Sequence, residues 1–147
     1  MAKIELPHNY EPRTYQLPVW RHMERGEDGL RAACEWHRRA GKDLFGINLT
    51  TVKSQERVAT YWHVLPTYKQ GRNIVWNGFT KEGRQFLDYI PDAIIANKNT
   101  TEMRITFKNK SIYQVVGTDN INSLVGTNPV GVIMSEYSLH DPAAWDY

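Results

Sequence analysis

The stretch Trp36-His37-Arg38-Arg39-Ala40-Gly41-Lys42-Asp43 decides the fold that the sequence predicts, together with the apolar run Ala32-Ala33-Cys34 before it. We interpret it as a degenerate phosphate-binding loop: a strand, a tight turn that ends in Gly-Lys, and then a helix. The usual pattern has glycine five positions before the glycine of that pair and Ser or Thr after the lysine, whereas this chain has Trp36 and Asp43 there. Taken alone, these residues also fit an ordinary basic turn between a strand and a helix, so the interpretation depends on the rest of the chain.

The length and composition of the chain indicate a single soluble domain. Its 147 residues are 41% hydrophobic and 23% charged, and the formal net charge of +2 is too small to indicate a nucleic-acid partner by itself. The one cysteine, Cys34, excludes an internal disulfide, and its place in the expected strand predicts a buried, unreactive thiol. The first residues lack the apolar segment of a signal peptide, and no stretch approaches the length of a membrane span, so we expect a cytoplasmic protein.

Hydrophobic periodicity divides the chain into alternating strands and helices. The expected strands are Leu30–Trp36, Val58–Leu65, Met103–Phe107, Ile112–Val116 and Val130–Met134. The expected helices are Tyr15–Arg25, residues 42–54, a segment capped by Thr67 that runs to Phe79, and residues 80–90. The pattern predicts one α/β domain of P-loop NTPase type over residues 1–147. Its mainly parallel sheet would be sandwiched by helices, with Val130–Met134 as a buried central strand.

The turn before the second helix carries groups that bind phosphate. Backbone N–H groups at Ala40, Gly41 and Lys42 would face phosphate oxygens at the helix N-terminus, where the helix dipole adds to the attraction. The Lys42 ammonium would reach the outer phosphates. Arg38 and Arg39 would bridge phosphate oxygens or stabilise the charge that develops on a leaving γ-phosphate.

The strand Val130–Met134 ends in Ser135-Glu136, as does the apolar strand with terminal acidic residues that faces a phosphate loop in nucleotide hydrolases. Glu136 is placed to orient or deprotonate the attacking water, and the alternative is a carboxylate that caps the next turn. Asp43 stands where such loops carry a hydroxyl, and Ser135 stands where the strand carries Asp. We hypothesise that the two have exchanged and together hold Mg²⁺; the alternative is that each position has lost its metal ligand.

Upstream of the loop, Gln16 and Tyr15 suit the recognition of adenine. The amide of Gln16 offers both a donor and an acceptor, and the ring of Tyr15 can stack on a base. The five histidines, His63 among them, have no metal-ligand spacing, and we interpret them as ordinary surface or half-buried residues.

Segments with motif character follow one another in a definite order: Pro12-Arg13-Thr14-Tyr15-Gln16, His37-Arg38-Arg39-Ala40-Gly41-Lys42-Asp43, Pro66-Thr67-Tyr68-Lys69-Gln70, Gly117-Thr118-Asp119-Asn120, Leu124-Val125-Gly126-Thr127 and Ser135-Glu136-Tyr137. This ordered set resembles the large terminase subunit of tailed bacteriophages over nearly the whole chain. The resemblance implies the ATPase domain of a DNA-packaging motor, in which ATP hydrolysis drives double-stranded DNA through a portal into a procapsid. The implied partners are double-stranded DNA, the small terminase subunit, the portal protein and neighbouring large-terminase subunits.

The resemblance also implies roles for individual residues. Gln16 would read adenine, Lys42 would bind phosphate, and Glu136 would be the catalytic carboxylate. Arg38 corresponds to the family's arginine four residues before the loop lysine. Val125 stands where many terminases carry an arginine that acts on a neighbouring subunit's nucleotide, so that role is missing here or falls to another residue such as Arg84 or Arg104.

A second departure from the family is length. Terminases continue with a coupling motif, further sheet strands and a nuclease domain, whereas Asp141 and Asp146 are the acidic residues that follow Glu136 here. We therefore expect an ATPase domain that is incomplete at its C-terminal end, lacks nuclease activity and is prone to self-association. The alternative function is that of a shortened prophage remnant that binds nucleotide or assembles without turnover.

Overall fold

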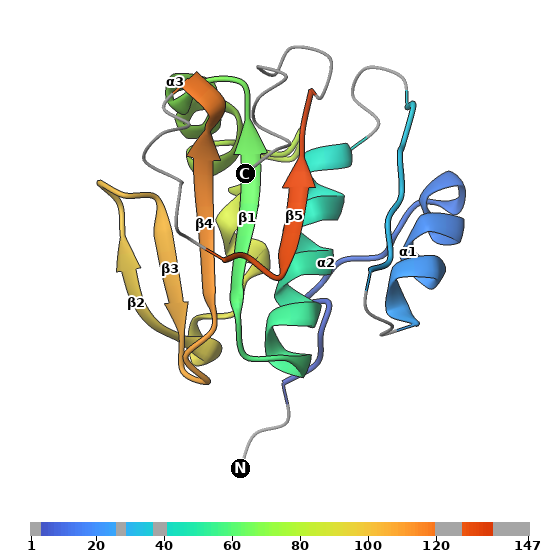
Figure 1. Ribbon diagram of the computed structural model, residues 1–147, viewed down its shortest axis with the longest axis horizontal. Coiled ribbons are helices and arrows are strands. Elements are labelled where there is room, and N and C mark those ends of the chain that lie inside the picture. The colour runs from blue at the N-terminus through green and yellow to red at the C-terminus, as the bar shows by residue number, and fades with distance from the viewer. Residues whose placement is uncertain (1–3, 26–28, 37–40, 120–127, 137–147) are drawn as a thin grey trace.

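A mixed five-stranded sheet forms the centre of the fold (Figure 1). The computed structural model describes residues 4–25, 29–36, 41–119 and 128–136. The strands are β1 (Thr60–Leu65), β2 (Ile95–Asn99), β3 (Arg104–Phe107), β4 (Ile112–Gly117) and β5 (Gly131–Met134). They lie in the order β2-β3-β4-β1-β5; β1 pairs in parallel with β4 and β5, and β2, β3 and β4 are antiparallel neighbours. The expected α/β class is confirmed, but the sheet is only partly parallel.

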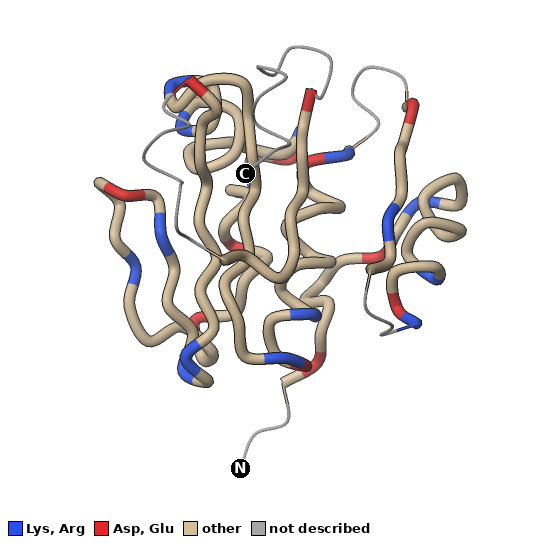
Figure 2. Tube along the Cα trace, in the orientation of Figure 1, with Lys and Arg blue, Asp and Glu red and all other residues tan. Residues whose placement is uncertain are grey.

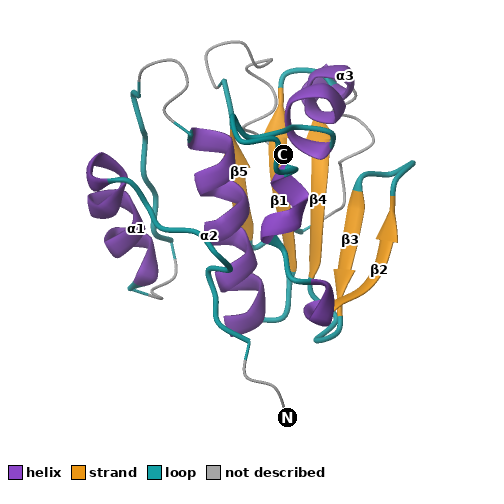
Figure 3. Cartoon of the chain, turned by 180° about the vertical axis from the view of Figure 1, so that it is seen from behind, coloured by secondary structure: helices purple, strands orange, loops and turns teal. Residues whose placement is uncertain are grey.

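The helices that pack on the sheet lie on one of its faces, the face turned toward the viewer in Figure 3. The α-helices are α1 (Leu17–Glu24), α2 (Lys42–Glu56) and α3 (Tyr68–Gln70). α3 runs directly into the π-helix η2 (Gly71–Trp76), and the 3₁₀ helices are η1 (Thr14–Gln16), η3 (Phe86–Tyr89) and η4 (Asp92–Ile94). Within the described residues no helix covers the opposite face, so the expected second helix layer is not found there. In the same part of the chain, no helix has the length and apolar composition that crossing a membrane requires.

The main core lies between α2, η2 and the sheet. Leu65 of β1, Tyr113 and Val115 of β4, Ile47 of α2 and Val75 of η2 are almost completely buried in it. β1 is buried on both faces, as a strand between two parallel neighbours requires. We expected that position for β5, but β5 is an edge strand, and the Val132 side chain is 45% exposed. That prediction is wrong because short apolar runs look the same at the centre and at the edge of a sheet.

Local sequence signals located most elements correctly. The first helix is confirmed as η1 and α1, the second as α2, and the expected hairpin as β3 and β4. The predicted helix cap at Thr67 is confirmed, since the Thr67 side chain accepts a hydrogen bond from the Gln70 backbone N–H. β2 was not predicted, because its central residues Ala96, Asn97 and Lys98 are exposed and give no apolar alternation; the strand is ordered by pairing with β3.

Two predicted elements are wrong. Leu30–Trp36 was expected as a buried strand, but it is extended chain that pairs with no strand in the described part of the protein. Its side chains from residue 31 to 35 are exposed, and the Cys34 thiol is exposed rather than buried. Residues 80–90 form a turn followed by η3 instead of a helix, because Gly83 adopts a φ of 84° and its N–H closes a tight turn onto the Thr80 carbonyl.

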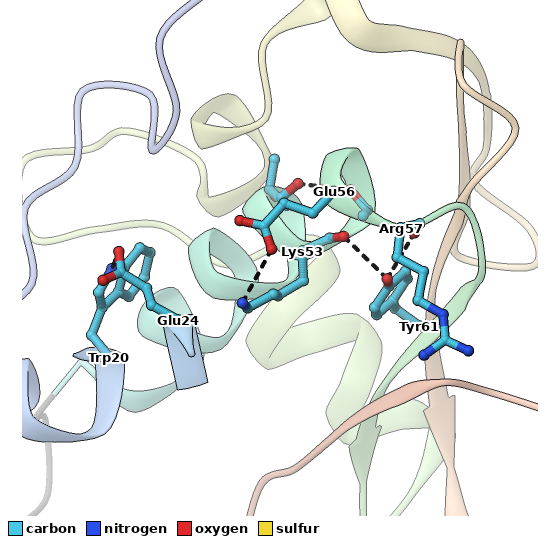
Figure 4. Close-up of polar contacts among 8 residues, drawn as sticks. Trp20, Glu24, Lys53, Glu56, Arg57 and Tyr61 are labelled. Atoms are coloured by element: carbon cyan, nitrogen blue, oxygen red, sulfur yellow. Dashed lines mark hydrogen bonds and ion pairs between the residues drawn. The ribbon is translucent and has the colours of Figure 1, made fainter. Parts of the chain in front are cut away.

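The last turn of α2 is fastened to the sheet by side chains (Figure 4). The Tyr61 hydroxyl of β1 lies 3.1 Å from the Lys53 carbonyl oxygen and 2.8 Å from that of Arg57, and so shares its proton between them. The Ser111 hydroxyl and the Asn109 amide both donate to the Ser54 carbonyl, each at 2.7 Å. The Lys53 carbonyl also accepts the Arg57 N–H at 3.0 Å, whereas Ser54 and Arg57 belong to the helix end that leaves carbonyls without helical partners. These side-chain bonds hold α2 against β1 and β4.

Candidate functional site

The N-terminus of α2 lies at the carboxyl ends of β1 and β5 (Figure 1). Gly41 precedes the helix with a φ of 75°, and its carbonyl accepts the Phe45 N–H at 2.9 Å. A Cβ at this position would lie 3.4 Å from the Arg13 Cζ and from the Gln16 Nε2. Glycine therefore supplies the left-handed turn, and Arg13 and Gln16 lie within van der Waals reach of the start of α2.

Lys42 and Glu136 form an ion pair that joins the start of α2 to the end of β5. Figure 2 shows an acidic segment at the end of β5 and a basic segment at the start of α2, both at this end of the sheet. The two side chains are 37% and 42% exposed, so the pair is open to solvent. Glu136 has a φ of 54°, which is uncommon outside glycine, directly after Ser135, whose N–H still pairs with the Val64 carbonyl at 2.9 Å. The chain thus turns sharply where the expected catalytic carboxylate stands.

Asp43 is the most enclosed charged group of the site. The His63 Nε2 lies 3.0 Å from the Asp43 Oδ1, and the carboxylate is 14% exposed. Burial acts to raise the pKa of Asp43, but the hydrogen bond from His63, a hydrogen bond with Ser135 and the charge of Lys42 together hold it below its usual range. The carboxylate is therefore ionised at neutral pH. The fold places Asp43 beside Ser135, the residue that we expected to hold Mg²⁺ together with it.

His63 is a site residue that we did not anticipate from the sequence. It was expected to be an ordinary surface or half-buried histidine, but it is fully buried in β1 between Asp43 and Tyr113. The Tyr113 hydroxyl lies 2.9 Å from the His63 Nδ1. The alternation of side chains along a strand could have predicted this position. In Thr60–Leu65 the side chain of His63 must lie on the same face of the sheet as those of Tyr61 and Leu65.

On the other side of Gly41, the residues expected to read adenine have partners within the protein. The Gln16 side chain is 1% exposed, and its Oε1 accepts from the Tyr10 hydroxyl at 3.1 Å and from the Arg13 N–H at 2.9 Å. Both lone pairs of this oxygen are thus engaged. The Tyr15 side chain is exposed, its hydroxyl accepts from Arg13 at 2.7 Å, and its ring meets the ring of Trp36 edge to face. Tyr15 is therefore an exposed aromatic residue beside the start of α2, whereas the amide of Gln16 is enclosed.

A second cluster of the motif residues lies at the start of α3. The Asp119 carboxylate accepts the Tyr68 N–H at 3.0 Å, and the Thr118 hydroxyl donates to the Pro66 carbonyl at 3.0 Å. A Cβ on Gly117 would lie 2.2 Å from the Tyr68 nitrogen. These residues fasten the end of β4 to the chain that leaves β1, which is a structural task.

Some expected site residues are not placed near the helix start. Arg38, Arg39, Ala40 and Val125 lie outside the described residues. Arg84 stacks on the Tyr89 ring at 3.8 Å, and Arg104 pairs with Glu102 at 3.2 Å. Neither arginine contacts Lys42, Asp43 or Glu136 in the contacts that the structure records.

The donor set at Asp43 suits a divalent cation bound together with phosphate. In the part of the chain that the structure describes, no three His, Cys, Asp or Glu side chains gather to hold a metal ion by themselves. Mg²⁺ commonly takes only one or two protein oxygens and completes its shell with phosphate and water. An ionised, enclosed Asp43 beside the hydroxyl of Ser135 fits that requirement. Comparisons with protein-family models, with curated proteins and with solved structures found no match.

Proposed function

We propose that the chain binds and hydrolyses ATP at the start of α2. The observation that supports this most is the meeting of Lys42 and Asp43, from the first turn of α2, with Ser135 and Glu136, from the end of β5. A lysine at a helix N-terminus and a carboxylate facing it are the groups that phosphoryl transfer to water needs. Ligands of α/β proteins commonly bind at the carboxyl end of parallel strands, where this group lies.

Nucleotide binding would begin with an exchange of partners at Lys42. The ion pair with Glu136 is solvent-exposed, and such pairs contribute only about 0–1 kcal/mol. A bound triphosphate offers Lys42 several charged oxygens and adds backbone N–H groups at the helix start. The exchange therefore favours the nucleotide, and it releases the Glu136 carboxylate.

The released Glu136 is the group proposed to activate water. A carboxylate at hydrogen-bonding distance from water accepts its proton as the oxygen attacks the γ-phosphorus in line with the leaving group. Arg38 and Arg39 directly precede Ala40-Gly41 in the sequence, and we propose them as the cations that stabilise charge on the transferred phosphoryl group.

Asp43 and Ser135 are the proposed ligands of Mg²⁺. Bound with the nucleotide, the ion would neutralise charge on the β- and γ-phosphates. The role of the protein is to keep an ionised oxygen and a hydroxyl together at that position. Tyr15, with Trp36 beside it, is the proposed surface for the base, and Gln16 its proposed reader after a change of hydrogen bonds at Oε1.

The finer proposal is that this ATPase belongs to a phage DNA-packaging motor. It rests on the ordered resemblance to the large terminase subunit. Double-stranded DNA, the small terminase subunit, the portal protein and neighbouring large subunits are then the proposed partners. The arginine that acts between subunits is proposed among Arg84 and Arg104, both on the surface of the chain's described part.

Steady-state phosphate release and ATP binding by calorimetry test the proposal on wild type, Lys42→Ala and Glu136→Gln. Lys53→Ala is the matched control, because Lys53 lies in the same helix and pairs with Glu56 at its far end. Turnover that disappears in both site variants and persists in the control supports hydrolysis at this site. Binding that needs Lys42, without turnover in wild type, supports a nucleotide-binding remnant. Wild-type protein that binds no ATP contradicts both.

A further inference from the structure

A buried line of three side chains runs from β4 through β1 to the first turn of α2. The Tyr113 hydroxyl lies 2.9 Å from the His63 Nδ1, and the His63 Nε2 lies 3.0 Å from the Asp43 Oδ1. Tyr113 and His63 have no exposed surface, and Asp43 is the outer end of the line, toward Lys42 and Ser135. None of the proposed chemical steps uses the two inner residues.

The direction of the two hydrogen bonds follows from the chemistry of Tyr113 and Asp43, the two ends of this line. Burial and the charge of Asp43 raise the pKa of Tyr113 well above its ordinary value, so its hydroxyl keeps its proton and can donate. With the Tyr113 hydroxyl as donor, the His63 Nδ1 is the acceptor, and the geometry assigns the ring proton to Nε2, from which Asp43 accepts it. One tautomer thus satisfies both neighbours.

We propose that His63 is a positioning residue that, with Tyr113 behind it, orients the Asp43 carboxylate as a ligand for the divalent cation of the nucleotide. The proposal rests on the proposed ATP site. A carboxylate at this point of the loop is longer than a hydroxyl and enclosed by protein, and it needs a fixed donor to stay in one orientation. Groups that orient a metal ligand in this way commonly change metal affinity about 10- to 100-fold when removed.

The packing around Gly46 holds the imidazole in place. A Cβ on Gly46 would lie 3.4 Å from the His63 Cε1 and 3.0 Å from the Ile133 Cγ2. The glycine in the second turn of α2 therefore lets the helix approach β1 and β5 closely enough for Asp43 to reach His63. The ring is confined between the helix backbone, Ile133 and Tyr113.

The first test needs no nucleotide. Long-range ¹H–¹⁵N spectra of histidine-labelled wild type report which ring nitrogen of His63 carries the proton, with His63→Gln identifying the signal. The proposal expects a protonated Nε2 and an unprotonated Nδ1. A ring protonated only at Nδ1 could not donate to Asp43 and would overturn the proposal.

The second test measures how strongly Mg²⁺ increases the affinity for a non-hydrolysable ATP analogue, by calorimetry with Mg²⁺ and with chelator. We expect His63→Leu to reduce the Mg²⁺ enhancement about 10-fold or more, whereas affinity in chelator stays near wild type. His63→Gln, which keeps an N–H donor, should retain most of the enhancement. His22→Leu is the control, because His22 contacts only the Arg31 carbonyl in the recorded bonds.

A double-mutant cycle separates positioning from general damage. In the Asp43→Asn background, replacing His63 with Leu should have no further effect on the Mg²⁺ enhancement, because the ligand it positions is already gone. An equal loss in both backgrounds, or an unchanged enhancement in His63→Leu alone, overturns the role of His63 and leaves the ATP site standing. Wild type that binds no nucleotide overturns the proposed function, and this inference with it.

Discussion

Lys42 and Glu136, 94 positions apart in the sequence, form an ion pair between the first turn of α2 and the end of β5. The pair joins the two segments that the phosphate-loop interpretation needs at one place.

Lys42→Ala should weaken ATP binding while it leaves the free energy of unfolding nearly unchanged. The exposed ion pair stabilises the fold by about 0–1 kcal/mol, so we expect the denaturant midpoint to change little. Loss of charge-assisted bonds to phosphate, worth about 1.5–3 kcal/mol, should weaken ATP binding by about 10- to 100-fold. Urea unfolding and calorimetry measure the two quantities. A large loss of stability with unaltered ATP affinity would mean that the pair is only a structural link.

Gly41→Ala should lower both stability and nucleotide affinity. A residue with a Cβ in the left-handed region costs about 1–2 kcal/mol, and the added methyl would lie in contact with Arg13 and Gln16. Gly83→Ala is the matched control, since Gly83 has a φ of 84° in open space at a distant turn. Both variants should unfold at lower denaturant, but only Gly41→Ala should bind ATP less tightly. Equal affinities in the two would argue against a ligand at the start of α2.

Gln16→Ala tests whether the enclosed amide has a structural task, a recognition task or both. Removing it leaves the Tyr10 hydroxyl and the Arg13 N–H without their acceptor, which should cost about 1–3 kcal/mol of unfolding free energy. If Gln16 also reads adenine, the preference for ATP over GTP should fall in the variant. Competition binding with the two nucleotides measures this. An unchanged preference would assign base recognition to other groups, such as the exposed Tyr15 ring.

Tyr61→Phe should change how stability depends on alkaline pH. Burial raises the pKa of Tyr61 above its ordinary value of 10.0, because the folded state favours the phenol that bonds to Lys53 and Arg57. That contribution, about 1 kcal/mol, is fully present below the ordinary pKa and is lost as pH rises through the raised one. Unfolding free energies from pH 8 to 11 should therefore converge between wild type and variant. A constant difference over that range would contradict this linkage.

The sequence by itself determined the elements whose signals are local. Residues 42–54, most of α2, were recognisable as a helix from the glycine before them and their apolar spacing, and Thr67 was recognisable as a cap. The hairpin of β3 and β4 was readable from two apolar runs around a polar turn, and β1 from its β-branched and aromatic residues. Each of these signals depends on a few consecutive residues, so it can be recognised without knowing which distant segments pack against them.

Tertiary structure alone decided which distant segments and side chains meet. Leu30–Trp36 and Gly131–Met134 are both short apolar runs, but only the second found a partner in β1, because a strand is stabilised by hydrogen bonds to a chain that lies far away in sequence. Likewise, the sequence separations of Asp43, His63 and Tyr113 do not predict that these side chains are in contact. It arises because parallel β1 and β4 bring His63 and Tyr113 beneath α2, where the absence of a side chain at Gly46 lets the helix lie close enough for the bond to form.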